Sequence, residues 1–230
     1  MPPVHPIWIF GSEVVYFIAV AILCLGIYLR TKDIYALSRL KTIFHFRNIF
    51  LYFFLAYAFR FVYLFILLSS DLGFRSLMIF QIFGMLVVSY FSTMAILSVL
   101  MTVLVKRIST ERKHVNILLH ISSIVLLAVV FVTGSLYVLA IFHIAILAFA
   151  AITMILKRKG SHFSNQNRIT YILLFIFWII NLFEFGRGNV QFITQLGVHA
   201  ISVAIFLSIY LRLRKRLKNA EKKGKTRNNK

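Results

Sequence analysis

The sequence predicts an all-α protein, a single bundle of seven helices that crosses a membrane seven times. The first observation is composition: 60% of the 230 residues are hydrophobic and 14% are charged, against about 45–50% and 25% in soluble domains. The second is a series of seven apolar runs of bilayer-crossing length. The third is that most of the net charge of +20 lies between alternate runs. Together they exclude a soluble globular domain and a disordered chain.

Seven predicted spans make up a transmembrane domain over residues 1–211, because a bilayer core about 30 Å thick needs ~20 mostly apolar helical residues. In order, they cover about 8–29, 49–68, 76–105, 115–131, 136–156, 169–185 and 190–211. The third is longer than a perpendicular crossing requires, so it tilts or projects on the inner side. Only Thr133-Gly134-Ser135 separates the fourth span from the fifth. An unbroken helix over 115–156 would be about 60 Å long, so we predict two crossings joined by a tight turn.

The basic residues predict the orientation of the bundle. Of the 26 Lys and Arg residues, 23 fall in four segments that share one side, namely 30–47, 106–114, 157–168 and 212–230. The N-terminus is therefore predicted outside and the C-terminus in the cytoplasm, in a multi-pass protein of the cell membrane. The first span is interpreted as a retained anchor rather than a cleaved signal peptide, and the short loops favour a prokaryotic plasma membrane.

Two inner segments have more than a linking role. Asp33 can cap a helix in which Ile34, Leu37, Leu40 and Phe44 recur at helical spacing. It is either an interfacial helix or an inner extension of the second span. The basic tail, 212–230, is predicted to lie against anionic lipids of the cytoplasmic leaflet and to be partly disordered. The tail contains no aromatic residue to stack on bases, so we predict no nucleic-acid partner.

Charged side chains inside the spans are the strongest functional signals, because they are costly in lipid. Arg60 in the second span is one, and Glu13 and Glu184 are the others. We predict that Arg60 forms an interhelical ion pair or network with one of the two carboxylates. The pair has either a structural role or a ligand-contacting role.

Polar residues at similar depth on other spans indicate a cavity near the outer surface. Gln195 and His199 share one face of the seventh span with Gln191 and Ser202. The candidate ligand-binding residues are Arg60, Glu13, Glu184, Gln81, His143, Asn181, Gln195 and His199. The alternative is that these groups only bond neighbouring helices, at ~0.6 kcal/mol per contact.

A few other intramembrane residues have a structural interpretation. His120, near the inner end of the fourth span, is expected to bond a backbone carbonyl rather than a ligand. Gly84 and Gly197 favour close helix packing over a local hinge. Cys24 is expected to be a small packing residue.

Patterns for catalysis, metal binding and prosthetic groups are not found in the sequence. It contains no H-E-x-x-H, no G-x-S-x-G, no P-loop and no cysteine cluster. We therefore predict no catalytic residue, no metal and no cofactor, and we favour a protein that is not an enzyme. The seven-span plan resembles that of opsins and G-protein-coupled receptors in topology only. A retinal opsin needs a lysine in its seventh span, and no lysine lies in any span predicted here.

The functional prediction is a receptor- or sensor-like membrane protein. It would bind an unidentified small ligand in the outer half of the bundle and act through cytoplasmic partners. One alternative is a small-solute transporter or channel, and a second is an accessory or structural subunit of a membrane complex. The predicted partners are the lipid bilayer, anionic lipids at the tail, the small ligand, and a cytoplasmic or membrane protein.

Overall fold

A computed structural model of the protein describes residues 6–69, 74–104, 112–156, 165–185 and 192–228. These residues form seven α-helices and no strand. The helices are α1 (Pro6–Ser38), α2 (Lys41–Ser69), α3 (Phe74–Leu104), α4 (Arg112–Thr133), α5 (Leu136–Leu156), α6 (Asn165–Phe185) and α7 (Phe192–Asn228). The predicted all-α class and the number of helices are confirmed for the described residues.

Six of the seven helices are long and apolar enough to cross a membrane. The exception is α6, whose described apolar part is the shorter segment Ile169–Asn181. The whole of α6 has 21 residues and measures about 31 Å at ~1.5 Å per residue. Its crossing therefore remains a prediction, as does the orientation of the bundle.

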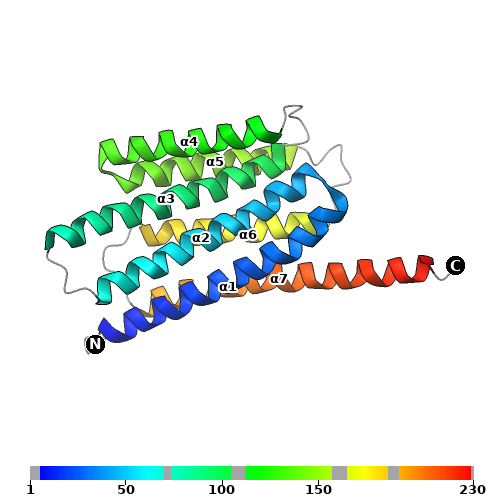
Figure 1. The fold of residues 1–230 in the computed structure, drawn as a ribbon, viewed down its shortest axis with the longest axis horizontal. Coiled ribbons are helices and arrows are strands. Elements are labelled where there is room, and N and C mark those ends of the chain that lie inside the picture. The colour runs from blue at the N-terminus through cyan, green and yellow to red at the C-terminus, as the bar shows by residue number, and fades with distance from the viewer. Residues whose placement is uncertain (1–5, 70–73, 105–111, 157–164, 186–191, 229–230) are drawn as a thin grey trace.

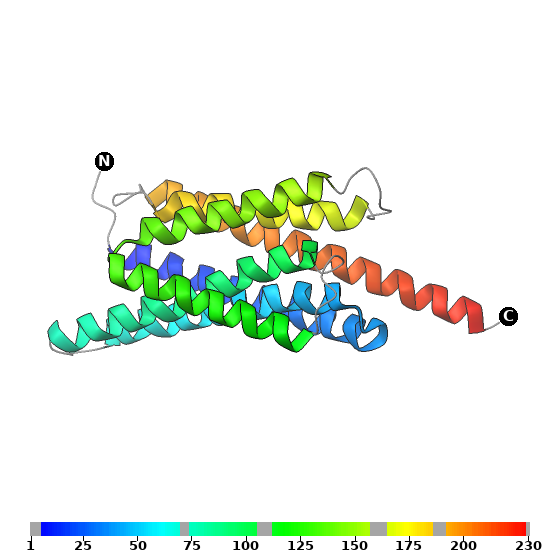
Figure 2. The ribbon, with the colours of Figure 1, turned by 90° about the horizontal axis from the view of Figure 1, so that it is seen from above.

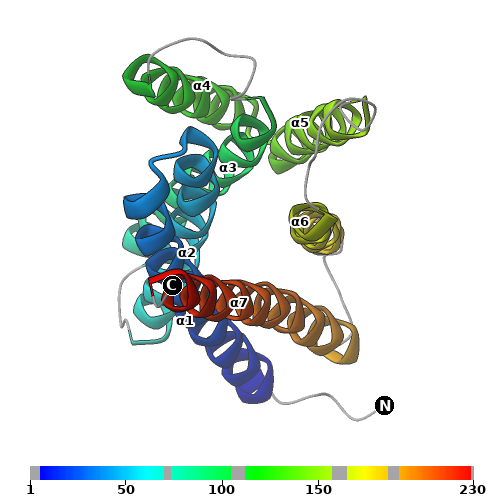
Figure 3. The same ribbon diagram turned by 90° about the vertical axis from the view of Figure 1, so that its right-hand side faces the viewer.

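The helices run up and down along one axis, so the described start of α1 and the end of α7 lie at opposite ends of the bundle (Figures 1 and 2). We call the end at which α1 begins the outer end and the opposite end the inner end, after the predicted topology. Seen along the axis, α1, α2, α3, α5, α6 and α7 follow one another around a ring, which the contact of α7 with α1 closes (Figure 3). The remaining helix, α4, packs on α3 and α5 outside this ring.

The turn between α4 and α5 has the predicted glycine. Gly134 adopts a φ of 60°, in the left-handed region that glycine enters without steric cost. A Cβ at this position would meet no atom within 4 Å, so backbone conformation rather than space favours glycine there. The prediction of two helices separated by Thr133-Gly134-Ser135 is confirmed.

The connection between α1 and α2 agrees with the sequence interpretations only in part, because α2 begins at Lys41 as an inner extension of the second span, whereas the residues up to Ser38 belong to α1. Asp33 lies inside α1, so it does not cap a new helix. Arg39 ends α1 with a φ of 50°, and its N–H donates to the Tyr35 carbonyl at 2.8 Å, as in a left-handed helix cap. The carbonyl of Leu40 then accepts the first hydrogen bonds of α2. The segment expected to form an interfacial helix is therefore divided: its first residues form the end of α1 and its last residues form the start of α2.

Helix α7 also continues beyond its predicted end near residue 211, through the basic segment to Asn228. It is an unbroken helix of 37 residues that extends past the other helices at the inner end (Figure 1).

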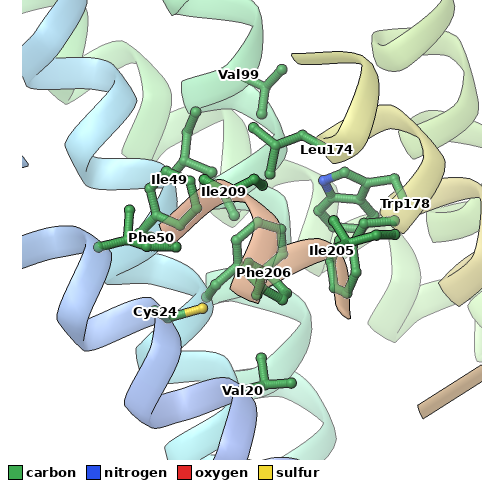
Figure 4. Close-up of a cluster of buried hydrophobic side chains, with 14 of the residues drawn as sticks. Val20, Cys24, Ile49, Phe50, Val99, Leu174, Trp178, Ile205, Phe206 and Ile209 are labelled. Carbon is green, nitrogen blue, oxygen red and sulfur yellow. The ribbon is translucent and has the colours of Figure 1, made fainter. Parts of the chain in front are cut away.

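Large side chains fill the centre of the ring (Figure 4). Phe206 is fully buried, with its ring centre 4.7 Å from that of Phe177, 5.6 Å from Phe53 and 6.3 Å from Phe50. Cys24 is buried in the same cluster, as expected of a packing residue. Many outward-facing aliphatic side chains are exposed, which is the pattern of helices that contact lipid. The core thus holds the six ring helices in the register that sets the polar contacts described next.

Candidate functional site

Three helices, α1, α2 and α7, bring polar residues together in the outer half of the bundle. Tyr16 of α1 lies at the centre of this group. Its ring stacks on that of His199 of α7, with centres 4.0 Å apart and planes 8° apart. Its hydroxyl lies 3.0 Å from the hydroxyl of Tyr57 of α2. All three side chains are buried, so Tyr16 joins α7 to α2 across the interior.

A second contact lies one helical turn nearer the outer end. The Gln195 amide donates a hydrogen bond of 2.7 Å to the carboxylate of Glu13, and both side chains are half-buried. Gln195 and His199 are four residues apart on α7, as predicted, and Glu13 and Tyr16 are three apart on α1. Each pair therefore occupies one helix face, and α1 and α7 meet through two successive polar layers.

Arg60 of α2 joins this group through Phe17 of α1. Its guanidinium carbon lies 4.7 Å from the centre of the Phe17 ring, a cation–π geometry. Arg60 also lies three residues after Tyr57, on the same face of α2. We call Glu13, Tyr16, Tyr57, Arg60, Gln195 and His199 the outer polar cluster.

The sequence predicts an ion pair of Arg60 with Glu13 or Glu184, and the structure tests only the first of these two partners. Among the described residues Arg60 makes no ion pair with Glu13, whose carboxylate bonds Gln195 instead. Glu184 falls within α6, but its side chain lies outside the described part of the structure. Pairing of Arg60 with Glu184 therefore stays a prediction.

His143 belongs to a separate buried contact between α3, α5 and α6. The Thr93 hydroxyl donates to the Ser89 carbonyl at 2.8 Å, so its oxygen accepts the N–H of His143 Nε2 at 3.1 Å. The His143 ring also packs on the Trp178 indole at a steep angle, with centres 5.1 Å apart and planes 74° apart. This contact stabilises helix packing and lies on other helices than the outer polar cluster.

The remaining predicted residues do not add to the cluster. The Asn181 amide donates to the carbonyl of Phe177 in its own helix at 2.8 Å. Gln81 lies in α3, but its side chain is outside the described set. His120 bonds the Tyr90 hydroxyl through Nδ1, so the expected backbone-carbonyl partner is replaced by a side chain of α3.

Tyr16 and Phe17 are the members of this region on α1 that sequence reasoning did not single out. Both are aromatic residues in an aromatic-rich chain, so composition gives no signal for them. Their position three and four residues after Glu13 was the available clue, because such residues share a helix face.

Within the described residues, no group of three or more His, Cys, Asp or Glu side chains could hold a metal ion. The outer polar cluster consists of hydrogen-bond donors and acceptors, one half-buried cation and aromatic rings. Such an arrangement can bind a ligand by charge, hydrogen bonds and stacking.

The fold and this cluster define a helical membrane protein with polar contacts inside its apolar bundle. In sequence the chain is similar to an uncharacterized protein of Archaeoglobus fulgidus, with 27% identity over 228 residues that cover 94% of this chain and 97% of the relative. No family model matches the sequence, and no solved structure matches it. The similarity therefore extends over nearly the whole bundle and gives no activity.

Proposed function

We propose that the protein is a receptor- or sensor-like membrane protein whose outer polar cluster binds a small ligand with an anionic group. The observation that carries the proposal is the state of Arg60. The Arg60 residue is half-buried on an apolar helix, its guanidinium lies against a phenylalanine ring, and among the described residues it has no ion pair with Glu13. Arginine in this setting is suited to bind a carboxylate or phosphate through two parallel hydrogen bonds.

The neighbours of Arg60 give such a ligand further contacts. Tyr57 lies one turn away on the same helix, and its hydroxyl contacts that of Tyr16, on whose ring His199 stacks. The Glu13–Gln195 pair adds an acceptor at the outer edge of the cluster. Because α7 carries both Gln195 and His199 and continues past the inner end of the bundle, a ligand held at the cluster contacts the helix that reaches cytoplasmic partners in the predicted orientation.

The packing of the core favours this proposal over transport. A solute that crossed between the six ring helices would have to pass Phe53, Phe177 and Phe206, whose rings are in mutual contact and at most 3% exposed. A receptor needs no such route, because its ligand enters and leaves from one side.

The test is a binding experiment on the full chain in neutral detergent. Its unfolding temperature is measured with acetate, benzoate and inorganic phosphate, and with acetamide and ethylamine as neutral and cationic comparisons. We expect at least one anion to raise the unfolding temperature of the wild type. Hydrogen bonds to a charged group contribute ~1.5–3 kcal/mol, so Arg60→Gln should weaken binding of the anion by about 10- to 150-fold. Arg212→Gln, which removes an exposed charge on α7, should leave binding unchanged.

The outcomes also separate the alternatives. The proposal fails if no anion stabilises the wild type more than acetamide does, or if Arg60→Gln binds as tightly as the wild type. Uptake of the bound anion into proteoliposomes by the wild type would instead indicate a transporter. An unliganded protein that copurifies with a second membrane protein in fixed ratio would indicate an accessory subunit.

A further inference from the structure

The α1–α2 turn at the inner end holds a second cation in an aromatic cage. The guanidinium carbon of Arg47 lies 5.2 Å from the ring centre of Tyr28, 5.1 Å from that of Tyr35 and 5.3 Å from that of Phe44. Two of the rings come from α1 and the third from α2. The cage therefore exists only because Arg39 and Leu40 turn the chain back on itself.

The burial and hydrogen bonding of Arg47 show which of its atoms contact the rings and which can bind a ligand. The side chain as a whole is half-buried, and its Nε atom is buried without a hydrogen-bond partner among the described residues. The rings of Tyr28, Tyr35 and Phe44 surround the guanidinium and restrict its position. Stacking on aromatic faces leaves the terminal N–H groups of an arginine available for a bidentate acceptor.

The surroundings of the cage are basic. Arg30, Lys32, Arg39 and Lys41 are all exposed on the same helix–turn–helix segment, and Asp33 is the only acidic residue between positions 30 and 47. The partial positive charge at the N-terminus of α2 is offset by the partial negative charge at the C-terminus of α1, which ends in the same turn, so the basic side chains set the sign of the potential. The potential at this turn thus favours an anion over water or a cation.

The predicted spans place the cage at the depth of a lipid phosphate. Arg47 precedes the predicted second span by two residues, and Tyr28 lies next to the end of the predicted first span. Tyrosine and arginine at the ends of apolar helices lie at the headgroup level of a bilayer, where basic pockets between membrane helices bind anionic headgroups.

We propose that the Arg47 cage is a binding site for the phosphate group of an anionic phospholipid. The rings orient the guanidinium, the terminal N–H groups of Arg47 hold two phosphate oxygens, and the exposed basic residues attract the headgroup. The site is independent of the outer polar cluster, which lies toward the opposite end of α1 and α2. Failure of either proposal therefore leaves the other unaffected.

Native mass spectrometry of the full chain in neutral detergent tests the site, with phosphatidylglycerol, phosphatidylcholine and glycerol 3-phosphate as probes. We expect the wild type to retain phosphatidylglycerol at least tenfold more tightly than phosphatidylcholine. Arg47→Gln should lower the affinity for phosphatidylglycerol at least tenfold. Tyr35→Leu should lower it at least threefold although the net charge is unchanged, because the cage no longer orients the arginine.

Arg214→Gln is the charge-matched comparison, on α7 where the sequence predicts only diffuse attraction of anionic lipid. It should change the affinity by no more than twofold. The proposal is overturned if Arg214→Gln and Arg47→Gln weaken binding equally, or if Tyr35→Leu binds as the wild type does. If Arg47→Gln does not fold, Arg47→Lys decides the question: it keeps the charge but loses the planar fork, and unchanged affinity would overturn the proposal.

The third probe identifies the source of the phosphate. Poor displacement of phosphatidylglycerol by glycerol 3-phosphate supports a lipid site, because the acyl chains then contribute to binding. Retention of glycerol 3-phosphate in an Arg47-dependent manner, with no preference for phosphatidylglycerol, would overturn the lipid assignment.

Discussion

Replacing Gly84 with alanine is expected to destabilise the bundle, because α2 and α3 approach closely there. A β-carbon at Gly84 would lie 2.7 Å from Tyr63 Cδ2 and 3.1 Å from Tyr63 Cγ, whereas carbon atoms in contact are ~3.5–4.0 Å apart. Since Cγ is fixed to the start of the side chain, the ring must retreat by about 1 Å together with its helix. Such overpacking costs ~1–3 kcal/mol. The gain of about 0.5–1 kcal/mol from replacing a helical glycine offsets part of this, so we expect a net loss of up to about 2.5 kcal/mol.

Gly197 is the matched control, because a β-carbon there would meet no atom of the described residues within 4 Å. The packing role predicted for this glycine is therefore wrong, while that of Gly84 is confirmed. Gly197→Ala should stabilise the protein by about 0.5–1 kcal/mol through helix propensity alone. Unfolding in sodium dodecyl sulfate, followed by far-ultraviolet circular dichroism, measures both variants. A Gly84→Ala variant as stable as Gly197→Ala would refute the close approach of α2 to α3.

Three further variants test contacts in the outer half and the core by the same unfolding measurement. Tyr16→Phe removes the hydroxyl contact with Tyr57 and should cost ~0.6 kcal/mol, the mean for interhelical hydrogen bonds in membranes. Thr93→Val leaves the buried N–H of His143 without its acceptor and should cost ~1–3 kcal/mol. Phe206→Ala opens a cavity among the core rings and should cost ~3–5 kcal/mol. The Tyr16–Tyr57 contact is contradicted if a double-mutant cycle of Tyr16→Phe and Tyr57→Phe shows no coupling. A Thr93→Val variant as stable as the wild type would contradict the contact with His143. A loss below 1 kcal/mol for Phe206→Ala would contradict the packing of the core rings.

Hydropathy predicted the helices well, because a membrane span contacts either lipid or the apolar core along its whole length and so needs apolar side chains throughout. It did not predict their ends, because the edge of an apolar run marks the edge of the bilayer rather than the end of a helix. Asp33 lies inside α1 for this reason, and α7 continues through charged residues to Asn228. The break at Gly134 was predictable, since a turn there needs a left-handed backbone.

Helix periodicity grouped Gln195 with His199 correctly, because residues four apart share a face. Periodicity says nothing about which helix that face meets. The neighbours of α7 are set by packing around the ring, which places Glu13 opposite Gln195 and Phe17 under Arg60. His143 and His199 lie in different contacts, because α5 packs on α3 rather than on α7.

Because α7 is one unbroken helix, a tilt of the whole helix about a point in the core would move its two ends in opposite directions. The helix continues for 22 residues from Phe206, in the packed core, to Asn228, a length of about 33 Å at ~1.5 Å per residue. A tilt of about 5° with Phe206 as the fulcrum would move the far end by roughly 3 Å, by the same geometry. An adjustment of less than 2 Å at Gln195, about 16 Å on the other side of the fulcrum, would suffice to produce it. A small displacement where α7 touches Glu13 would therefore arrive amplified about twofold, and reversed in direction, at the basic end of the helix.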